Sequence, residues 1–243
     1  MRSGNPVLQD RIFDNAIATS DTRTMTVGGT VQKTAFLLAL TLGTAIWSWT
    51  RVSPQNIGPL VIGGAIAGLV VAIIISLNPK SAPLLSPVYA LVEGVVIGTL
   101  SMVFEAQYPG IVIQAAGLTF ATAFALLGAY STGMIKVTHK FRMGIVAATG
   151  GIALMYLVSM ATRLFGGGGL AFLHSSGPLG IGVSLVIVTV AALNLVLDFD
   201  FIDRGASQGA PRYLEWYGAF ALIVTLIWLY LEMLRLLSKF QRR

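Results

Sequence analysis

Long apolar stretches alternate with short polar breaks along most of this chain. Seven windows are apolar over roughly 20 residues, the length that an α-helix needs to cross the hydrocarbon core of a bilayer. They cover residues 34–50, 57–77, 84–104, 111–135, 144–164, 179–199 and 213–237. Every backbone group must be hydrogen-bonded internally in lipid, so continuous apolar runs of this length are expected to be helices. The pattern predicts an all-α, polytopic membrane protein with about seven transmembrane helices.

The composition indicates that most of the surface faces lipid rather than water. Of the 243 residues, 55% are hydrophobic and only 11% are charged. A soluble domain carries roughly 25% charged residues because its surface must be hydrated. The lipid bilayer is therefore the expected environment of the folded chain.

The basic residues lie mainly outside the apolar windows. The formal net charge is +6, which on a soluble protein would favour nucleic acid as a partner. Here the excess follows the tails and loops, as the positive-inside rule describes, so we expect no nucleic-acid binding and a cytoplasmic N-terminus. The basic segment 235–243 conflicts with seven full crossings, which leaves the side of the C-terminus open. The tail and loop residues concerned are Arg2, Arg11, Arg23, Lys33, Lys136, Lys140, Arg142, Arg242 and Arg243.

The polarity of the chain changes after its first 32 residues. Residues 1–32 are polar and mixed in charge, and they lack the short apolar core and cleavage site of a signal peptide. We expect a polar, cytoplasmic N-terminal tail over residues 1–32 and a seven-helix transmembrane domain over residues 33–243.

Small residues inside the windows indicate how the helices pack. Glycines allow the backbones of two helices to approach closely, and we expect this at Gly63, Gly64, Gly68, Gly94, Gly98, Gly150 and Gly151. The first window also carries a stripe of small polar residues, which we interpret as interhelical hydrogen bonds rather than as the border of an aqueous path. These residues are Thr34, Thr41, Thr44 and Ser48.

Several kinds of chemistry are excluded by residue type. The chain has no cysteine, which excludes disulfides, thiol catalysis and thiolate metal sites. Its two histidines, His139 and His174, fall in predicted loops far apart in the sequence, so a histidine metal site is not expected. We expect neither a metal nor a cofactor.

Three acidic residues lie within the apolar windows: Glu93, Asp198 and Glu232. A charged side chain near the bilayer centre costs at least about 2.5–3.5 kcal/mol, so it is normally turned inward, paired or protonated. Each residue also has a structural interpretation: a hydrogen bond for Glu93, an interfacial position for Asp198, and a local ion pair with Arg235 for Glu232.

The window 179–199 has one small and polar helical face. Ser184, Ala191 and Asp198 recur every seven residues, and Asn194 lies one turn before Asp198. Such a face is suited to border an aqueous path or to form hydrogen bonds between helices. In the first case Glu93, Asn194 and Ser184 are the expected pore-lining or ion-path residues.

Two segments resemble a known family. Asn194-Leu-Val-Leu-Asp198-Phe-Asp-Phe-Ile202 and Trp228-Leu-Tyr-Leu-Glu232-Met-Leu-Arg-Leu-Leu237 resemble the last two helices of the Bax inhibitor-1 (transmembrane Bax-inhibitor-motif) family. The resemblance extends over nearly the whole hydrophobic part, including Pro87 to Gly98, and the N-terminal segment is similar to a bacterial branch. It implies a seven-helix fold with a central last helix, a location in the bacterial plasma membrane, and a pH-sensitive leak with Ca²⁺ as the permeant ion.

The resemblance also implies a sensor made of two acidic residues. In bacterial members, two aspartates of the last two helices share a proton and latch the pore. Asp198 matches the first by its Asp-Phe-x-x-Ile context, and Glu232 falls where the second is expected, with glutamate in place of aspartate. Two carboxyls in contact at low dielectric cannot both ionise cheaply, so one shared proton would tie the helices together. Loss of this proton would make the two carboxylates repel each other, and together they would attract a hard cation.

Three other functions are compatible with such a chain to different degrees. The resemblance permits a non-conducting regulator that binds other membrane proteins, such as quality-control proteases; cation flux would separate it from a channel. An intramembrane aspartyl protease needs matched catalytic carboxyls, and the Tyr-Asp and Gly-x-Gly-Asp motifs of such enzymes do not occur, so no enzyme is expected. A secondary transporter usually has paired repeats, and no repeat is evident.

Overall fold

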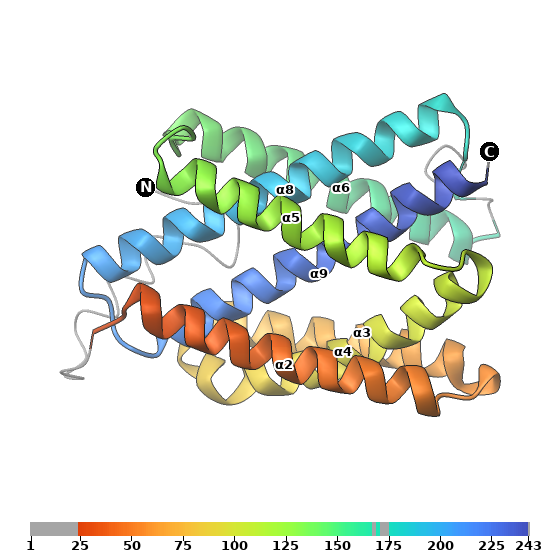
Figure 1. Ribbon diagram of the computed structural model, residues 1–243, viewed down its shortest axis with the longest axis horizontal. Helices are drawn as coiled ribbons and strands as arrows, with labels where there is room; N and C mark the ends of the chain where they lie inside the picture. Colours follow the sequence, from red (N-terminus) through yellow and green to blue (C-terminus); the bar gives the residue numbers. More distant parts are fainter. Residues whose placement is uncertain (1–23, 167–168, 171–174, 243) are drawn as a thin grey trace.

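The computed structural model describes residues 24–242, apart from residues 167–168 and 171–174, and in these residues the chain forms seven α-helices joined by short connections (Figure 1). Six of the helices, all except α2, are long and apolar enough to cross a membrane. The prediction of an all-α, multi-pass membrane protein is confirmed. The helices are α2 (Val27–Arg51), α3 (Ile57–Leu77), α4 (Ala82–Gln107), α5 (Ile111–Ser131), α6 (His139–Leu164), α8 (Pro178–Ser207) and α9 (Leu214–Gln241).

Helix α2 is less apolar than the other six because threonine, serine and tryptophan side chains interrupt its aliphatic residues. It is 25 residues long and packs along α4 within the bundle. It begins at Val27, inside the segment expected to be tail, and the hydroxyl of Thr26 caps it by accepting a hydrogen bond from Gly29 N at 2.9 Å. Residues 1–23 of the expected tail lie outside the described residues, as does His174.

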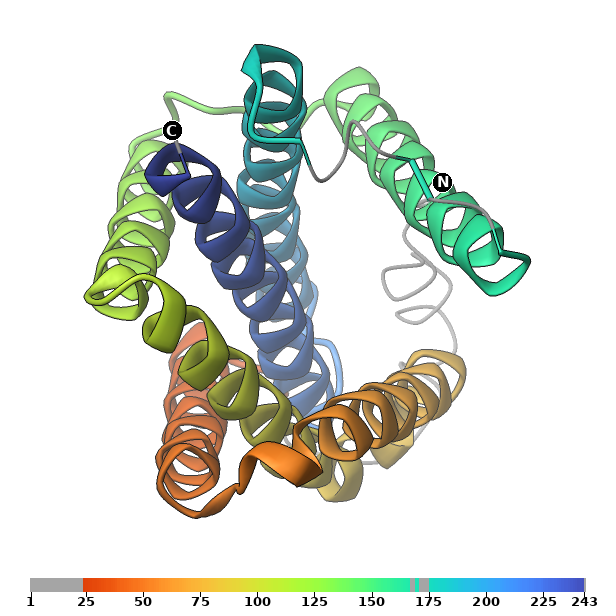
Figure 2. The same cartoon turned by 90° about the vertical axis from the view of Figure 1, so that its right-hand side faces the viewer.

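Helix α9 passes through the middle of the bundle (Figure 2). It packs against α2, α4, α5 and α8, and buried side chains lie on all its sides. A helix that is apolar all round is expected to be enclosed by other helices. The predicted central position of the last helix is therefore confirmed.

Helices α2 and α4 approach each other closely at two glycines. A Cβ atom at Gly98 would lie 2.2 Å from the carbonyl oxygen of Ala45, and one at Gly94 would lie 2.5 Å from that of Thr41. The hydroxyls of the α2 stripe bond within their own helix, as Thr41 does to Leu37 O at 3.0 Å. The predicted close approach is confirmed here, whereas the interhelical hydrogen bonds expected of the stripe are wrong, because backbone carbonyls one turn earlier are nearer acceptors.

The other glycines behave unequally. Added Cβ atoms at Gly64 and Gly68 would meet Val96 and Glu93 of α4, which confirms a close approach between α3 and α4. At Gly63 of α3, and at Gly150 and Gly151 of α6, an added Cβ atom would meet nothing within 4 Å among the described residues, so the close approach predicted there is wrong.

The helices alternate in direction, so the chain ends opposite to where α2 begins (Figure 1). We call the end with the start of α2 and the α8–α9 turn the N-terminal face, and the end where α9 finishes the C-terminal face. Met25 N donates a hydrogen bond to Ala210 O at 2.6 Å on the N-terminal face, and Thr24 pairs with Pro211 in an isolated β-bridge. The segment before α2 is thereby attached to the α8–α9 turn.

Candidate functional site

Helices α8 and α9 pack antiparallel, and polar side chains recur along their contact. Two contacts indicate how they are aligned: Lys239 Nζ donates to Ser184 Oγ at 2.7 Å, and the Thr225 side chain lies close to Asp198. On each helix these contacts are two seven-residue steps apart, so Glu232 lies opposite the intermediate α8 position. A seven-residue period keeps one helix face against its neighbour. We call this contact the α8–α9 seam, formed by Ser184, Ala191 and Asp198 of α8 and Thr225, Glu232 and Lys239 of α9.

The two carboxyls expected to form a pair occupy successive steps of the seam. Asp198 lies in the half of α8 that leads to the N-terminal face, whereas Glu232 lies in the half of α9 that leads to the C-terminal face. Seven residues of α-helix correspond to about 10 Å along the axis. A proton shared directly between Asp198 and Glu232 therefore requires α8 and α9 to rearrange from the conformation described.

Asp198 is enclosed by neutral groups of α9. It is 2% exposed, and besides Thr225 it lies near the phenol of Tyr217, whose ring contacts Phe201 and Phe220. Among the described residues, neither Asp198 Oδ2 nor the Tyr217 hydroxyl has a hydrogen-bond partner, and no Lys or Arg forms an ion pair with Asp198. An ionised carboxylate is costly in such surroundings. The arrangement has unused capacity for a proton, a water molecule or a cation.

Glu232 is equally buried but has a charged partner. Its Oε1 accepts hydrogen bonds from the Tyr156 hydroxyl of α6 at 2.8 Å and from Arg235 at 2.7 Å, while Oε2 has no partner among the described residues. The structure contains the local ion pair considered for Glu232 from the sequence. Arg142, one of the basic residues outside the apolar windows, pairs with Asp200 of α8 at 2.8 Å.

The three residues predicted to line an ion path do not all lie on the seam. Asn194 donates through Nδ2 to Thr149 Oγ1 of α6 at 2.8 Å, which ties α8 to α6 beside the seam. Ser184 lies on the seam itself. Glu93 does not join them, because it packs against Gly68 between α3 and α4.

Lys239 is a seam residue that was not predicted from the sequence. Its exposed fraction is 7%, and its ammonium also donates to the carbonyl oxygen of Gly180 at 2.9 Å. In the sequence it belongs to the basic C-terminal segment, which suggests a hydrated side chain. The signal that could have found it is its seven-residue spacing from Glu232, which repeats the spacing of Glu232 from Thr225.

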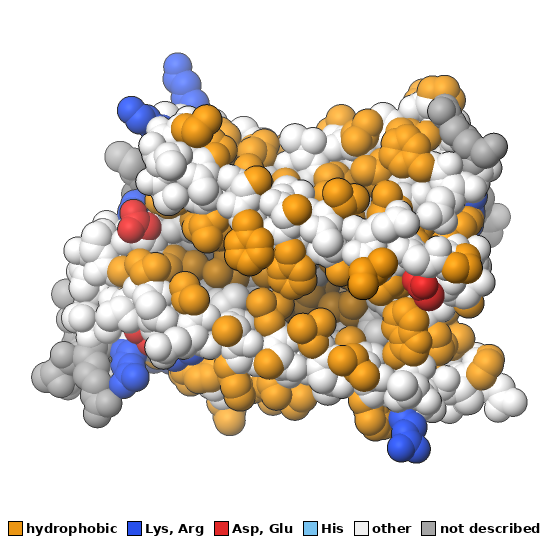
Figure 3. Space-filling model, in the orientation of Figure 1, with side chains coloured by type: hydrophobic (Ala, Val, Ile, Leu, Met, Phe, Trp, Pro, Cys, Tyr) orange, Lys and Arg blue, Asp and Glu red, His pale blue; other side chains and the backbone are white. Residues whose placement is uncertain are grey.

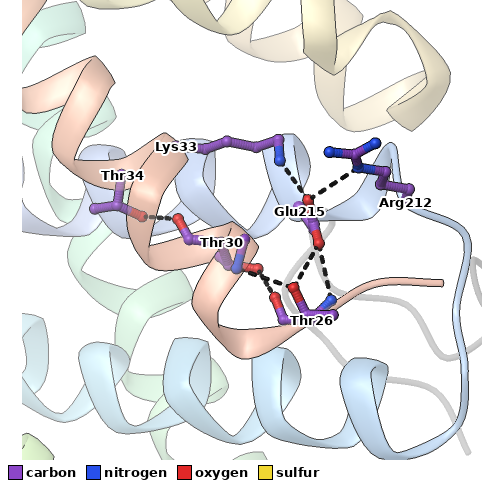
Figure 4. A network of polar contacts seen from close by, with 7 residues as sticks. Thr26, Thr30, Lys33, Thr34, Arg212 and Glu215 are labelled. Carbon is purple, nitrogen blue, oxygen red and sulfur yellow. Dashed lines mark hydrogen bonds and ion pairs between the residues drawn. The ribbon is translucent and has the colours of Figure 1, made fainter. Parts of the chain in front are cut away.

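Another buried carboxylate, that of Glu215, ties three segments together at the N-terminal face (Figure 4). Glu215, in the first turn of α9, accepts hydrogen bonds from the backbone nitrogen and the hydroxyl of Thr26, both at 2.9 Å. It also forms ion pairs with Lys33 of α2 and, at 3.8 Å, with Arg212 of the α8–α9 turn. Both oxygens of this carboxylate have hydrogen-bond or ion-pair partners, which indicates a structural role for the cluster. The sequence places Glu215 beside a loop and gives no sign of its burial.

A large cavity lies beside the seam rather than on it. It has a volume of about 800 Å³ and opens as the hollow between α2 and α5 (Figure 3), with α8 and α9 behind it. Its walls are mainly apolar, and Tyr130, Lys136 and Asp203 lie among its lining residues towards the N-terminal face. Neither Asp198 nor Glu232 lines this cavity, so the seam is closed to it.

Comparison with protein families identifies the relationship. A family model described as Bax inhibitor 1 like matches residues 5–242, which is essentially the whole chain. The chain therefore belongs to this family, and the resemblance inferred from its last two helices is confirmed. A search of curated proteins found no significant match.

Proposed function

We propose that this Bax inhibitor 1 like protein lets cations, with Ca²⁺ as the main candidate, pass through the bacterial plasma membrane under the control of protons. Asp198 and Glu232 are the groups that respond to pH. The observation that carries the proposal is that both carboxyls are buried on one seam and that each has an oxygen without a partner among the described residues. Protons and hard cations compete for such oxygens, because either one compensates the negative charge.

The proton on Asp198 keeps the seam closed in this proposal. A neutral carboxyl fits beside Thr225 and Tyr217, whereas an ionised one favours conformations that admit water or a cation. Opening therefore releases a proton, and a conformational change that releases protons is favoured as pH rises. The expected sign is low flux at low pH and higher flux at higher pH.

Glu232 provides the second oxygen site along the same path. Its partner Arg235 is 45% exposed at the side chain, so the guanidinium can turn towards water when a cation takes its place beside the buried carboxylate. A cation that leaves Asp198 then meets Glu232 about 10 Å further along the seam. Ser184 and Asn194 border this path, whereas Glu93 lies outside it.

A second candidate function is a non-conducting regulator that binds other membrane proteins, such as quality-control proteases. Helix α6 favours it, because its Gly144, Gly150 and Gly151 have free space beside them. Small residues on an outward face allow another membrane helix to approach closely.

The test is Ca²⁺ uptake by liposomes that contain the purified protein, recorded over a series of external pH values. We expect uptake to rise with pH, by at most about tenfold per unit for one controlling proton. Asp198→Asn, which imitates the neutral acid, should give low uptake that does not depend on pH. Glu232→Gln should lower uptake at every pH, because the second site loses its charge.

The matched control is Asp203→Asn, which changes an exposed aspartate of α8 near the N-terminal face and should behave as the unchanged protein. Uptake equal to that of protein-free liposomes at every pH, with folded protein, would exclude the channel and leave the regulator as the better explanation.

A further inference from the structure

Lys239 has an unusual position for a lysine near the end of a membrane helix. Such side chains normally extend outward so that the ammonium reaches water. Lys239 instead turns into the bundle, where it donates to Gly180 O at 2.9 Å and to Ser184 Oγ at 2.7 Å. Arg242, at the same end of α9, follows the ordinary pattern: it is exposed and donates to the Tyr108 hydroxyl at 2.6 Å.

The electrostatics of the helix do not explain this position. Gly180 and Ser184 belong to the first two turns of α8, which begins at Pro178. The N-terminal end of a helix carries partial positive charge, so the helix dipole disfavours a cation there. The ammonium is held by its specific oxygen partners against that dipole.

The oxygens around Lys239 are of the kind that hard cations bind. Ca²⁺ takes backbone carbonyl, hydroxyl and carboxylate oxygens as ligands. The seam offers the first two at Gly180 and Ser184, and the carboxylate of Glu232 one seven-residue step deeper. The charges near the ammonium on its own helix are those of Glu232 and Arg235.

We infer that Lys239 is a tethered cation that closes the seam at the C-terminal face by occupying the oxygen site that a permeating cation would use. The inference rests on the proposed function, which it deepens by naming the residue that closes one end of the path. Passage requires the ammonium to leave Gly180 and Ser184 and to extend into water, as lysines at helix ends ordinarily do.

The first experiment compares Lys239→Met, which keeps an unbranched side chain without the charge, with Lys239→Arg, which keeps the charge. In the liposome assay Lys239→Met should raise Ca²⁺ uptake by about fivefold or more at a pH where the unchanged protein is nearly closed. Lys239→Arg and the exposed control Arg242→Gln should stay at the unchanged level. Thermal unfolding in detergent identifies any variant that does not fold.

The second experiment measures access to the site without relying on flux. The chain has no cysteine, so Ser184→Cys provides a single thiol that a small cationic thiol reagent can modify from the C-terminal face. Modification should be faster when Lys239→Met is added, and should remain slow with Lys239→Arg.

The two readouts separate the inference from the function on which it rests. If modification is no faster in folded Lys239→Met, Lys239 is a structural anchor and the inference is overturned. If modification is faster but no variant takes up Ca²⁺ at any pH, Lys239 does close the site, and it is the conducting function that fails.

Discussion

Asp198 and Glu215 are both 2% exposed, and their partners make them different kinds of residue. Glu215 is surrounded by Lys33, Arg212 and the donors of Thr26, so its ionised form is compensated. In the part of the chain that the structure describes, the neighbours of Asp198 are neutral and its Oδ2 has no hydrogen-bond partner. Burial of a carboxyl therefore does not by itself identify a functional group. The number and charge of its partners decide between a structural and a proton-controlled role.

The sequence allowed one of these two residues to be found and not the other. Asp198 was predicted because it follows a long apolar run, where a charge needs an explanation. Glu215 was not, because its lysine partner is 182 residues away in the chain. No local pattern reports a contact of that separation.

Removing the charge of Glu215 should destabilise the protein. Glu215→Gln leaves Lys33 without its counter-charge in a largely buried position, and breaking a buried ion pair in this way costs about 3 kcal/mol or more. The measurement is the free energy of unfolding in detergent. Asp203→Asn, which alters an exposed carboxylate, should stay within about 0.5 kcal/mol of the unchanged protein. Equal stability of both variants would show that the Glu215 cluster does not hold the N-terminal face.

At the scale of the elements, spacing in the sequence predicted faces but not the partners of those faces. Gly94 and Gly98 are four residues apart and do meet another helix, whereas Gly150 and Gly151 meet none. Small residues show that a close approach is allowed, and only the packing determines whether it occurs.

In the α8–α9 seam, too, the sequence predicted a helix face but not the residues that it contacts. The seven-residue period of α8 was visible in the sequence, and α9 has the same period at Thr225, Glu232 and Lys239. How the two helices are aligned depends on the turn between them, which periodicity does not report. The sequence therefore left open whether Asp198 meets Glu232, and in the structure Asp198 lies beside Thr225.

The contact between α2 and α4 should depend on Gly98. In Gly98→Ala the new methyl group would overlap the carbonyl of Ala45, so the two helices must separate at a cost of about 1–3 kcal/mol. Gly150→Ala adds the same atom on α6 where nothing lies within 4 Å, and should be neutral or slightly stabilising. Thermal unfolding of both variants in detergent tests this. A destabilisation of the same size in both would mean that helix packing at Gly98 is not the cause.

At the scale of the whole molecule, the directions of the helices determine on which face of the bundle the basic C-terminal segment lies. The end of α9 and the start of α2 lie on opposite faces of the bundle (Figure 1), which places the basic C-terminal segment away from most of the basic loops. The central position of α9 has a further consequence. Because α2, α4 and α5 all pack against α9, a movement of α9 at the seam changes its packing against each of them.

The central claim is that Asp198 holds a proton when the path is closed and loses it when the path opens. The measurement that tests this most directly is an infrared pH titration of the reconstituted protein, which detects the band of a protonated carboxyl group, compared with Asp198→Asn. We predict a band that disappears over the same pH interval in which Ca²⁺ uptake rises, and that is missing from Asp198→Asn but present in Asp203→Asn. A spectrum of Asp198→Asn identical to that of the unchanged protein at every pH would contradict the account.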